Sequence, residues 1–89
     1  MKGKNMKTIK YNNKTIKLPF ESADYGDEPL KEIEVKNRFS GEACTMPAFA
    51  VAVYDVIMGS EMFQDWDSHR KGLDWFRKYF PAQYMVVLD

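Results

Sequence analysis

The chain has 89 residues, which is enough for one domain but too few for two. Hydrophobic residues make up 45% of it and aromatic residues 15%, which excludes an intrinsically disordered chain, because disorder requires low hydrophobicity and high net charge. The formal net charge of zero disfavours a protein whose main task is to coat nucleic acid. We expect a single domain over residues 1–89, with residues 1–5 flexible.

The first element expected along the chain is a β-hairpin over residues 6–18. Two Lys-Thr-Ile-Lys runs flank Asn12-Asn13, and asparagine tolerates the positive φ that a two-residue type I′ turn requires. Period-two alternation then places the isoleucines on one face of the hairpin. The opposite face is the candidate nucleic-acid face and carries Thr8, Lys10, Thr15 and Lys17. Lysines on an edge strand also guard against aggregation, which is the alternative interpretation.

A loop over residues 19–29 and a second hairpin over residues 33–45 are expected next. The acidic run at residues 24–28 lacks the spaced ligands and closing glutamate of an EF-hand, so an acidic turn is favoured over a calcium site. In the second hairpin, apolar and charged residues alternate from Ile33 to Phe39, and Ser40-Gly41 supplies the turn.

Two helices are predicted after the hairpins. Thr45 is placed to cap the first, which runs to about Met58 with Gly59-Ser60 as a stop or kink. Residues 48–54 have no polar face, so this helix is either buried on all sides or has one face covered by a second chain.

The second predicted helix spans residues 68–80, with Asp67 as its cap, and it stops before Pro81. Its aromatic and basic residues interleave, as they do in proteins that bind single-stranded nucleic acid. At helical spacing the rings fall mostly inward and the cations outward, so a core face with a solvated face is favoured. Residues 84–88 are expected to form a short final strand.

These elements predict an α+β fold in which two antiparallel hairpins form a small sheet packed against two helices. The residues chosen for its core are large, apolar and correctly spaced for the inward faces. They are Phe39, Phe49, Val53, Tyr54, Ile57, Leu73, Phe76 and Phe80.

No catalytic, cofactor or metal site is predicted, and no cofactor is expected. Asp65, Asp67 and His69 alternate and are metal-binding residue types, but a capping aspartate and a hydrogen-bonded histidine are the favoured interpretation. Cys44 has no histidine near it in sequence, so a buried structural cysteine is expected. A metal-dependent enzyme built on the two aspartates and the histidine is the third-ranked hypothesis.

Three stretches and the C-terminal residues resemble small uncharacterised proteins of contractile-tailed phages of marine cyanobacteria. The stretches are residues 37–42 (NRFSGE), 52–55 (AVYD) and 71–80 (KGLDWFRKYF), followed by residues 84–89 (YMVVLD). The family has no known activity, so the resemblance implies no functional residue. It implies a setting, the cytoplasm of an infected bacterium, where small accessory phage proteins often bind host or phage macromolecules.

The leading functional prediction is a non-enzymatic protein-interaction protein that forms a homodimer. A small domain cannot easily bury every face of an apolar helix, and exposed apolar patches mark interfaces. The candidate interaction surface is Met58, Met62, Phe63 and Trp66. The alternative is a nucleic-acid-binding module that uses the lysine-rich hairpin. No membrane partner is expected, because the longest apolar run is far short of the ~20 residues that span a bilayer, and the single cysteine suits a reducing cytoplasm.

Overall fold

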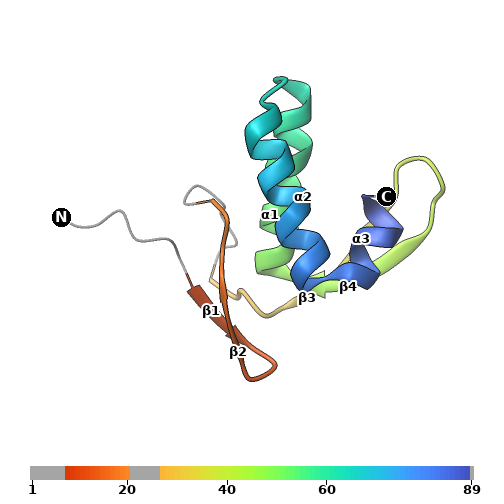
Figure 1. Cartoon of the computed structure of the whole chain (residues 1–89). Helices are drawn as coiled ribbons and strands as arrows, with labels where there is room; N and C mark the ends of the chain where they lie inside the picture. Colours follow the sequence, from red (N-terminus) through yellow and green to blue (C-terminus); the bar gives the residue numbers. More distant parts are fainter. Residues whose placement is uncertain (1–7, 21–26, 89) are drawn as a thin grey trace.

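The computed structural model describes residues 8–20 and 27–88, and within them it has two β-hairpins and three helices (Figure 1). The elements in chain order are β1 (Thr8–Tyr11), β2 (Lys14–Lys17), β3 (Glu32–Lys36), β4 (Ala43–Pro47), α1 (Ala48–Met62), α2 (Trp66–Tyr79) and α3 (Pro81–Val87). The α+β class and both hairpins are confirmed. The hairpins form two separate two-stranded sheets instead of one continuous sheet. Residues 1–5, which were predicted to be flexible, lie outside the described residues. Residues 24–26, the first part of the predicted acidic turn, also lie outside them.

The β1–β2 hairpin has the predicted turn and register. Asn12 and Asn13 adopt φ values of 51° and 65°, as a type I′ turn requires. Ile9 pairs with Ile16, and both side chains are buried. The hairpin lies against the helices through this apolar face, so its opposite face is free for solvent.

The β3–β4 hairpin is antiparallel, with Val35 opposite Cys44, and its turn shows one wrong core prediction. Phe39 is 91% exposed. The side-chain oxygen of Asn37 accepts hydrogen bonds from the backbone N–H groups of Phe39 (2.7 Å) and Ser40 (3.0 Å). This Asx-type turn ends the strand before Phe39, so the alternation that would have buried the ring does not continue.

Helix α1 begins at Ala48 without the predicted cap. Thr45 is a strand residue in β4, and the N-cap position is Pro47, whose side chain makes no capping bond. The first helical N–H groups are instead satisfied by backbone: Ala48 donates to the Lys31 carbonyl (2.8 Å) and Phe49 to the Pro29 carbonyl (3.0 Å). These tertiary bonds satisfy donors that a side-chain cap would otherwise serve.

The predicted stop at Gly59-Ser60 is wrong, because α1 continues to Met62. The helix ends in a Schellman motif, in which Gln64 donates to the Glu61 carbonyl (3.1 Å) and Asp65 to the Ser60 carbonyl (2.8 Å). Gln64 takes the left-handed conformation (φ 60°) that glycine usually supplies there. Helix α2 follows at once, so α1 and α2 form a helical hairpin (Figure 1).

The predicted final strand is also wrong, because residues 81–87 form helix α3. Pro81 occupies the first turn, where its missing N–H costs nothing. Two tertiary hydrogen bonds hold the helix to the second hairpin: Asn37 Nδ2 donates to the Val86 carbonyl (2.8 Å), and Gln83 Nε2 donates to the Thr45 carbonyl (3.2 Å). Tertiary contacts thus override the strand preference of the valines.

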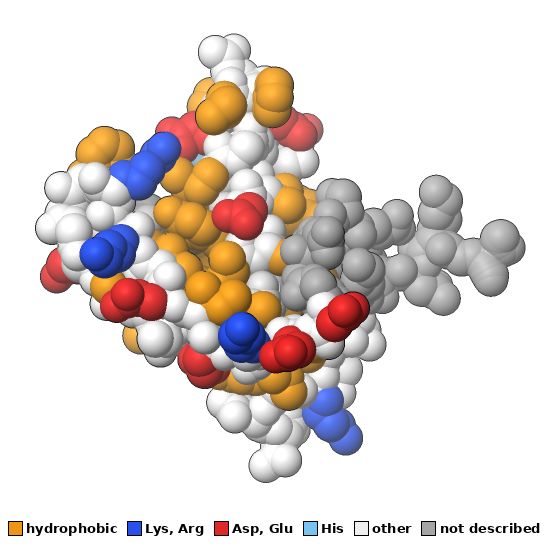
Figure 2. All heavy atoms as spheres, turned by 180° about the vertical axis from the view of Figure 1, so that it is seen from behind, with side chains coloured by type: hydrophobic (Ala, Val, Ile, Leu, Met, Phe, Trp, Pro, Cys, Tyr) orange, Lys and Arg blue, Asp and Glu red, His pale blue; other side chains and the backbone are white. Residues whose placement is uncertain are grey.

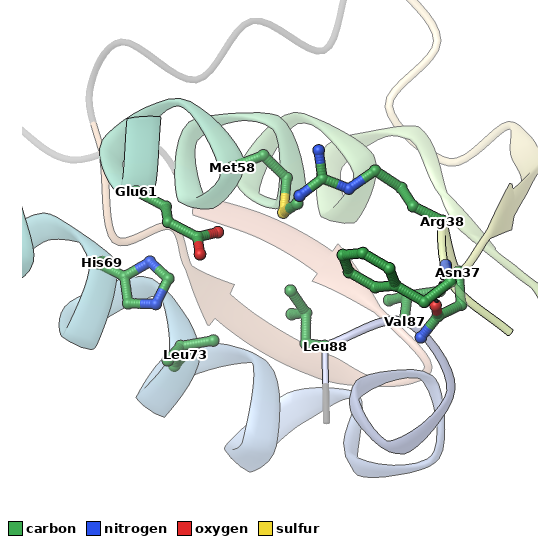
Figure 3. A pocket seen from close by; sticks show the side chains of 9 residues that line it. Asn37, Arg38, Met58, Glu61, His69, Leu73, Val87 and Leu88 are labelled. Atoms are coloured by element: carbon green, nitrogen blue, oxygen red, sulfur yellow. Dashed lines mark hydrogen bonds between the residues drawn. The ribbon is translucent and has the colours of Figure 1, made fainter. Parts of the chain in front are cut away.

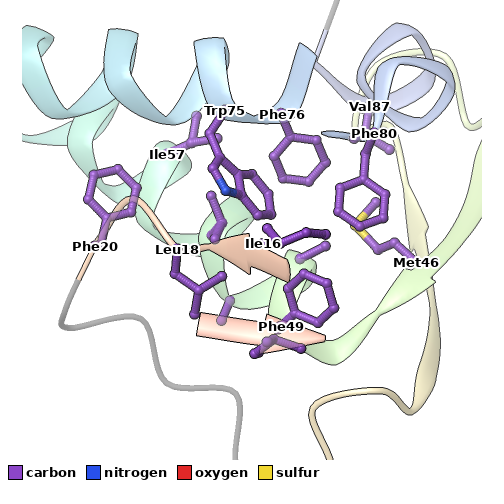
Figure 4. Packing of buried hydrophobic residues seen from close by; sticks show 14 residues of the cluster. Ile16, Leu18, Phe20, Met46, Phe49, Ile57, Trp75, Phe76, Phe80 and Val87 are labelled. Atoms are coloured by element: carbon purple, nitrogen blue, oxygen red, sulfur yellow. The ribbon is translucent and has the colours of Figure 1, made fainter. Parts of the chain in front are cut away.

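The core lies where the first hairpin meets the helical hairpin and α3 (Figure 4). Five of the predicted core residues are buried and two are half-buried. The buried ones are Phe49, Val53, Ile57, Phe76 and Phe80, and the half-buried ones are Tyr54 and Leu73. The indole N–H of Trp75 donates to the Lys17 carbonyl (2.9 Å), which ties the first hairpin to α2. None of the helices among the described residues combines the length and apolar character needed to cross a bilayer.

Candidate functional site

Helix α1 carries a row of partly exposed apolar side chains beside its exposed acidic residues Asp55 and Glu61. Val51, Tyr54, Met58 and Met62 recur at intervals of three and four residues, which places them on one face of the helix. Val51, Tyr54 and Met58 are half-buried, and Met62 is 77% exposed. We call these four residues the α1 outer face. Figure 2 shows a band of hydrophobic side chains on the back of the molecule, with one acidic side chain within it and other charged side chains at its margins.

The corner between α1 and α2 continues this exposure of apolar side chains. Phe63 is 81% exposed and Trp66 is 55% exposed, so two more residues of the predicted interaction surface are accessible. Met58 and Phe63 lie beside different recesses of the surface, and Phe63 lines its recess with Val56. Val51 and Tyr54 are half-buried and pack against the core, so they contribute only part of their surface to this face.

A cavity of about 220 Å³ opens beside Met58, between α1, α2, α3 and the β3–β4 turn (Figure 3). Leu73, Val87 and Leu88 give it an apolar lining. Glu61 and His69 point toward one another at one end of it, and Arg38 extends toward Met58 at the other (Figure 3).

The cavity is chemically a small apolar recess with a charged rim. Its volume is below the roughly 300 Å³ at which pockets for small-molecule ligands begin. The Arg38 guanidinium lies 5.6 Å from the centre of the exposed Phe39 ring, so this cation is already partnered by an aromatic face. Such a recess suits one inserted side chain from a partner, as the anchor pockets of interfaces do.

Burial perturbs two titratable groups in this region. Desolvation raises the pKa of Asp55, the one charged residue among the solvent-facing positions between Val51 and Met58. Desolvation also raises the pKa of the half-buried Cys44 thiol, which favours its protonated form.

The structure gives Asp65 and His69 structural contacts. Asp65 Oδ1 accepts the Ser68 N–H (3.2 Å) and caps α2, so the prediction that Asp67 caps this helix is wrong. Nδ1 of His69 lies 3.4 Å from the Ile57 carbonyl oxygen, and its ring packs edge-to-face on Trp66. Across residues 8–20 and 27–88, no three His, Cys, Asp or Glu side chains gather closely enough to hold a metal ion.

The candidate nucleic-acid face forms as the register predicts. Its four residues are all exposed, with Thr8 opposite Lys17 and Lys10 opposite Thr15. Lys17 also reaches the edge of α2, where it lines a recess with Lys71 and Lys78. The sequence could not show that these lysines line the same recess, because they lie on elements far apart in the chain.

The comparisons with known proteins add no relative. No protein-family model matches the chain, no curated protein matches its sequence, and no solved structure matches its fold.

Proposed function

We propose that this protein is a non-enzymatic protein-interaction module that works as a homodimer, with the α1 outer face at the centre of the dimer interface. The observation that carries the proposal is the repeat of apolar side chains on the outward side of a helix that also fills the core from its inward side. Val51, Tyr54 and Met58 stay partly exposed and Met62 is exposed, and apolar side chains that remain accessible together mark an interaction surface.

A second copy of this chain is the partner that suits the face best. A two-fold interface brings the same patch of both subunits together, so the patch must be complementary to itself. An apolar stripe meets this condition, because apolar side chains pack well against their own kind. Within the stripe, repulsion between two copies would be limited to the Asp55 carboxylate of each. A partner of opposite charge would need a charged patch here, and the stripe does not have one.

The neighbouring surface supplies the remaining interface area. A standard interface buries roughly 800 Å² per partner, about an eighth of the 5970 Å² surface of this chain. A 15-residue helix is only about 22 Å long, so its face alone is too small. Phe39 on one flank and the α1–α2 corner at one end expose the further apolar side chains that such an area needs.

The resemblance to small phage proteins supports the setting we propose for this module, the cytoplasm of an infected bacterium. A compact accessory protein there would act by binding macromolecules, either its own copies or another protein. This setting is compatible with the absence of a spanning helix in the described residues.

Sedimentation velocity between 1 and 100 µM tests the dimer. We expect the wild-type mass to approach twice 10.4 kDa as the concentration rises. Met58→Glu would place a charge at the middle of the α1 outer face, and Met62→Glu would place one at its more exposed end. Both should shift the protein to monomer, because a desolvated carboxylate is costly. Circular dichroism would establish that each variant is folded.

Met85→Glu is the matched control, because Met85 is 62% exposed on α3 and lies outside the α1 outer face. It should leave the dimer unchanged. A wild-type protein that stays monomeric at 100 µM would contradict the homodimer. An equal loss of dimer in Met85→Glu would show that the α1 outer face is not the interface.

A further inference from the structure

A second recess, of about 390 Å³, lies between the end of β2 and the exposed edge of α2. Lys17 lines it from the strand side, and Lys71 and Lys78 line it from the helix. Trp75 and Tyr79 form its aromatic side. We call these five residues the basic groove. Its volume is within the range of roughly 300–1,000 Å³ that ligand pockets occupy.

The lysines are held around the groove by the packing of the fold. The Trp75 indole N–H donates to the Lys17 carbonyl at 2.9 Å, so the strand that carries Lys17 is fixed against the helix that carries the other two lysines. Asp74 is the one acidic residue among the described residues that line the recess, and it is ion-paired with Arg77. The groove therefore presents three lysines and one carboxylate, which has an arginine as its ion-pair partner.

The aromatic side chains add a second kind of contact. Tyr79 is half-buried, and the Lys78 ammonium lies 5.2 Å from the centre of its ring. The ammonium lies over one face of the ring, so a base that stacks on Tyr79 would displace Lys78 from the ring and leave this cation to contact a phosphate. The cationic path also continues beyond the groove, because Lys17 shares the outer face of the first hairpin with Lys10.

We propose that the basic groove binds single-stranded nucleic acid, with phosphates on the lysines and a base against Tyr79. A single strand is favoured over a duplex because its bases are free to stack on a protein ring, whereas those of a duplex are stacked on one another. The groove residues are separate from the α1 outer face, so this proposal does not depend on the homodimer.

Fluorescence anisotropy with a labelled 20-nucleotide oligothymidylate tests the groove. We expect binding at 50 mM NaCl and a logarithmic salt slope of about −0.7 for each lysine–phosphate contact, hence about −2 to −3 for three or four lysines. Raising the salt to 200 mM should then weaken binding by about 20- to 50-fold. Lys17→Gln and Lys78→Gln should each weaken binding and make the slope shallower by about 0.7.

Lys36→Gln is the charge-matched control, because Lys36 is exposed on β3 and does not line the groove. It should change neither the affinity nor the slope. A second readout uses Trp66→Phe, which leaves Trp75 as the sole tryptophan of the two in the chain. Its fluorescence should change when the oligonucleotide binds, since Trp75 lines the groove.

Three results would overturn the proposal. The first is no anisotropy change at 50 mM NaCl. The second is an equal loss of affinity in Lys36→Gln, which would indicate diffuse attraction in place of a site. The third is a duplex of the same length that binds as tightly as the single strand, because stacking on Tyr79 would then have no part in binding.

Discussion

The two aspartates at the start of α2 are two residues apart, but only one of them caps the helix. Asp65 has a non-helical backbone, and its side chain accepts the Ser68 N–H, whereas Asp67 lies within the first turn. A capping carboxylate satisfies a backbone donor and also interacts with the helix dipole, while a carboxylate in the first turn has only the dipole interaction.

We therefore expect Asp65→Ala to lower the free energy of unfolding by about 1 kcal/mol and Asp67→Ala by about 0.5 kcal/mol or less. Urea denaturation of the two variants under identical conditions measures the difference, and each serves as the control for the other. The assignment of the cap would be wrong if the Asp67 variant proved the less stable of the two.

At the scale of the elements, the contact between α1 and α2 depends on a glycine. Gly72 on α2 is buried, and a methyl group there would contact Ile57 Cγ1 and lie 2.9 Å from Ile57 Cδ1 and 3.3 Å from Phe20 Cζ. The two helices can approach closely at this point only because Gly72 has no side chain.

Gly72→Ala should lower the free energy of unfolding by about 1–3 kcal/mol, since overpacking outweighs the better helix propensity of alanine. Gly59→Ala is the matched control, because a methyl group at Gly59 in α1 would meet nothing within 4 Å. That control should stabilise the protein by up to about 1 kcal/mol. Thermal unfolding followed by circular dichroism compares them, and similar effects of the two substitutions would refute the close contact.

The elements that the sequence predicted correctly are those with local causes. The Asn12-Asn13 turn fixes the register of the first hairpin within a few residues, and helical spacing identifies the inward face of α2. The errors have tertiary causes. Backbone carbonyls at residues 29 and 31 satisfy the start of α1 in place of Thr45, and one side-chain hydrogen bond in each direction between the second hairpin and α3 holds residues 81–87 as a helix.

The candidate surfaces also divide into features with local causes, which the sequence predicted, and features with tertiary causes, which it did not. The apolar character of α1 predicted an interaction surface, and alternation along the first hairpin predicted its exposed lysines. The cavity beside Met58 requires the packing of α1, α2, α3 and the second hairpin, and the recess that Lys17 and Lys78 line requires the packing of β2 against α2, which no local pattern specifies. The regular alternation before it placed Phe39 in the core. The Asx-type turn at Asn37 interrupts that alternation, and the sequence pattern did not show this turn.

For the whole molecule, the α1 outer face makes stability depend on pH through Asp55. This carboxyl lies on an apolar helix, and desolvation raises its pKa in the folded state above the ordinary value of an aspartate. Between the unfolded and the folded pKa, the folded protein binds more protons than the unfolded one. The free energy of unfolding contributed by Asp55 therefore falls as the pH rises through that interval and stays lower above it.

Asp55→Asn removes this dependence, so the variant should gain stability relative to wild type as the pH rises, with the gain complete at pH 7. Urea denaturation at a series of pH values from 3 to 7 measures the difference between the two proteins, in which the contributions of the other carboxylates cancel. Glu34→Gln, at an exposed position on β3, is the control and should show no such trend. In the proposed dimer Asp55 is desolvated further, so Asp55→Asn should also tighten dimerisation at pH 7 in sedimentation velocity. A difference that is constant with pH would contradict the desolvation of this carboxyl, and a weaker dimer in Asp55→Asn would place Asp55 outside the interface.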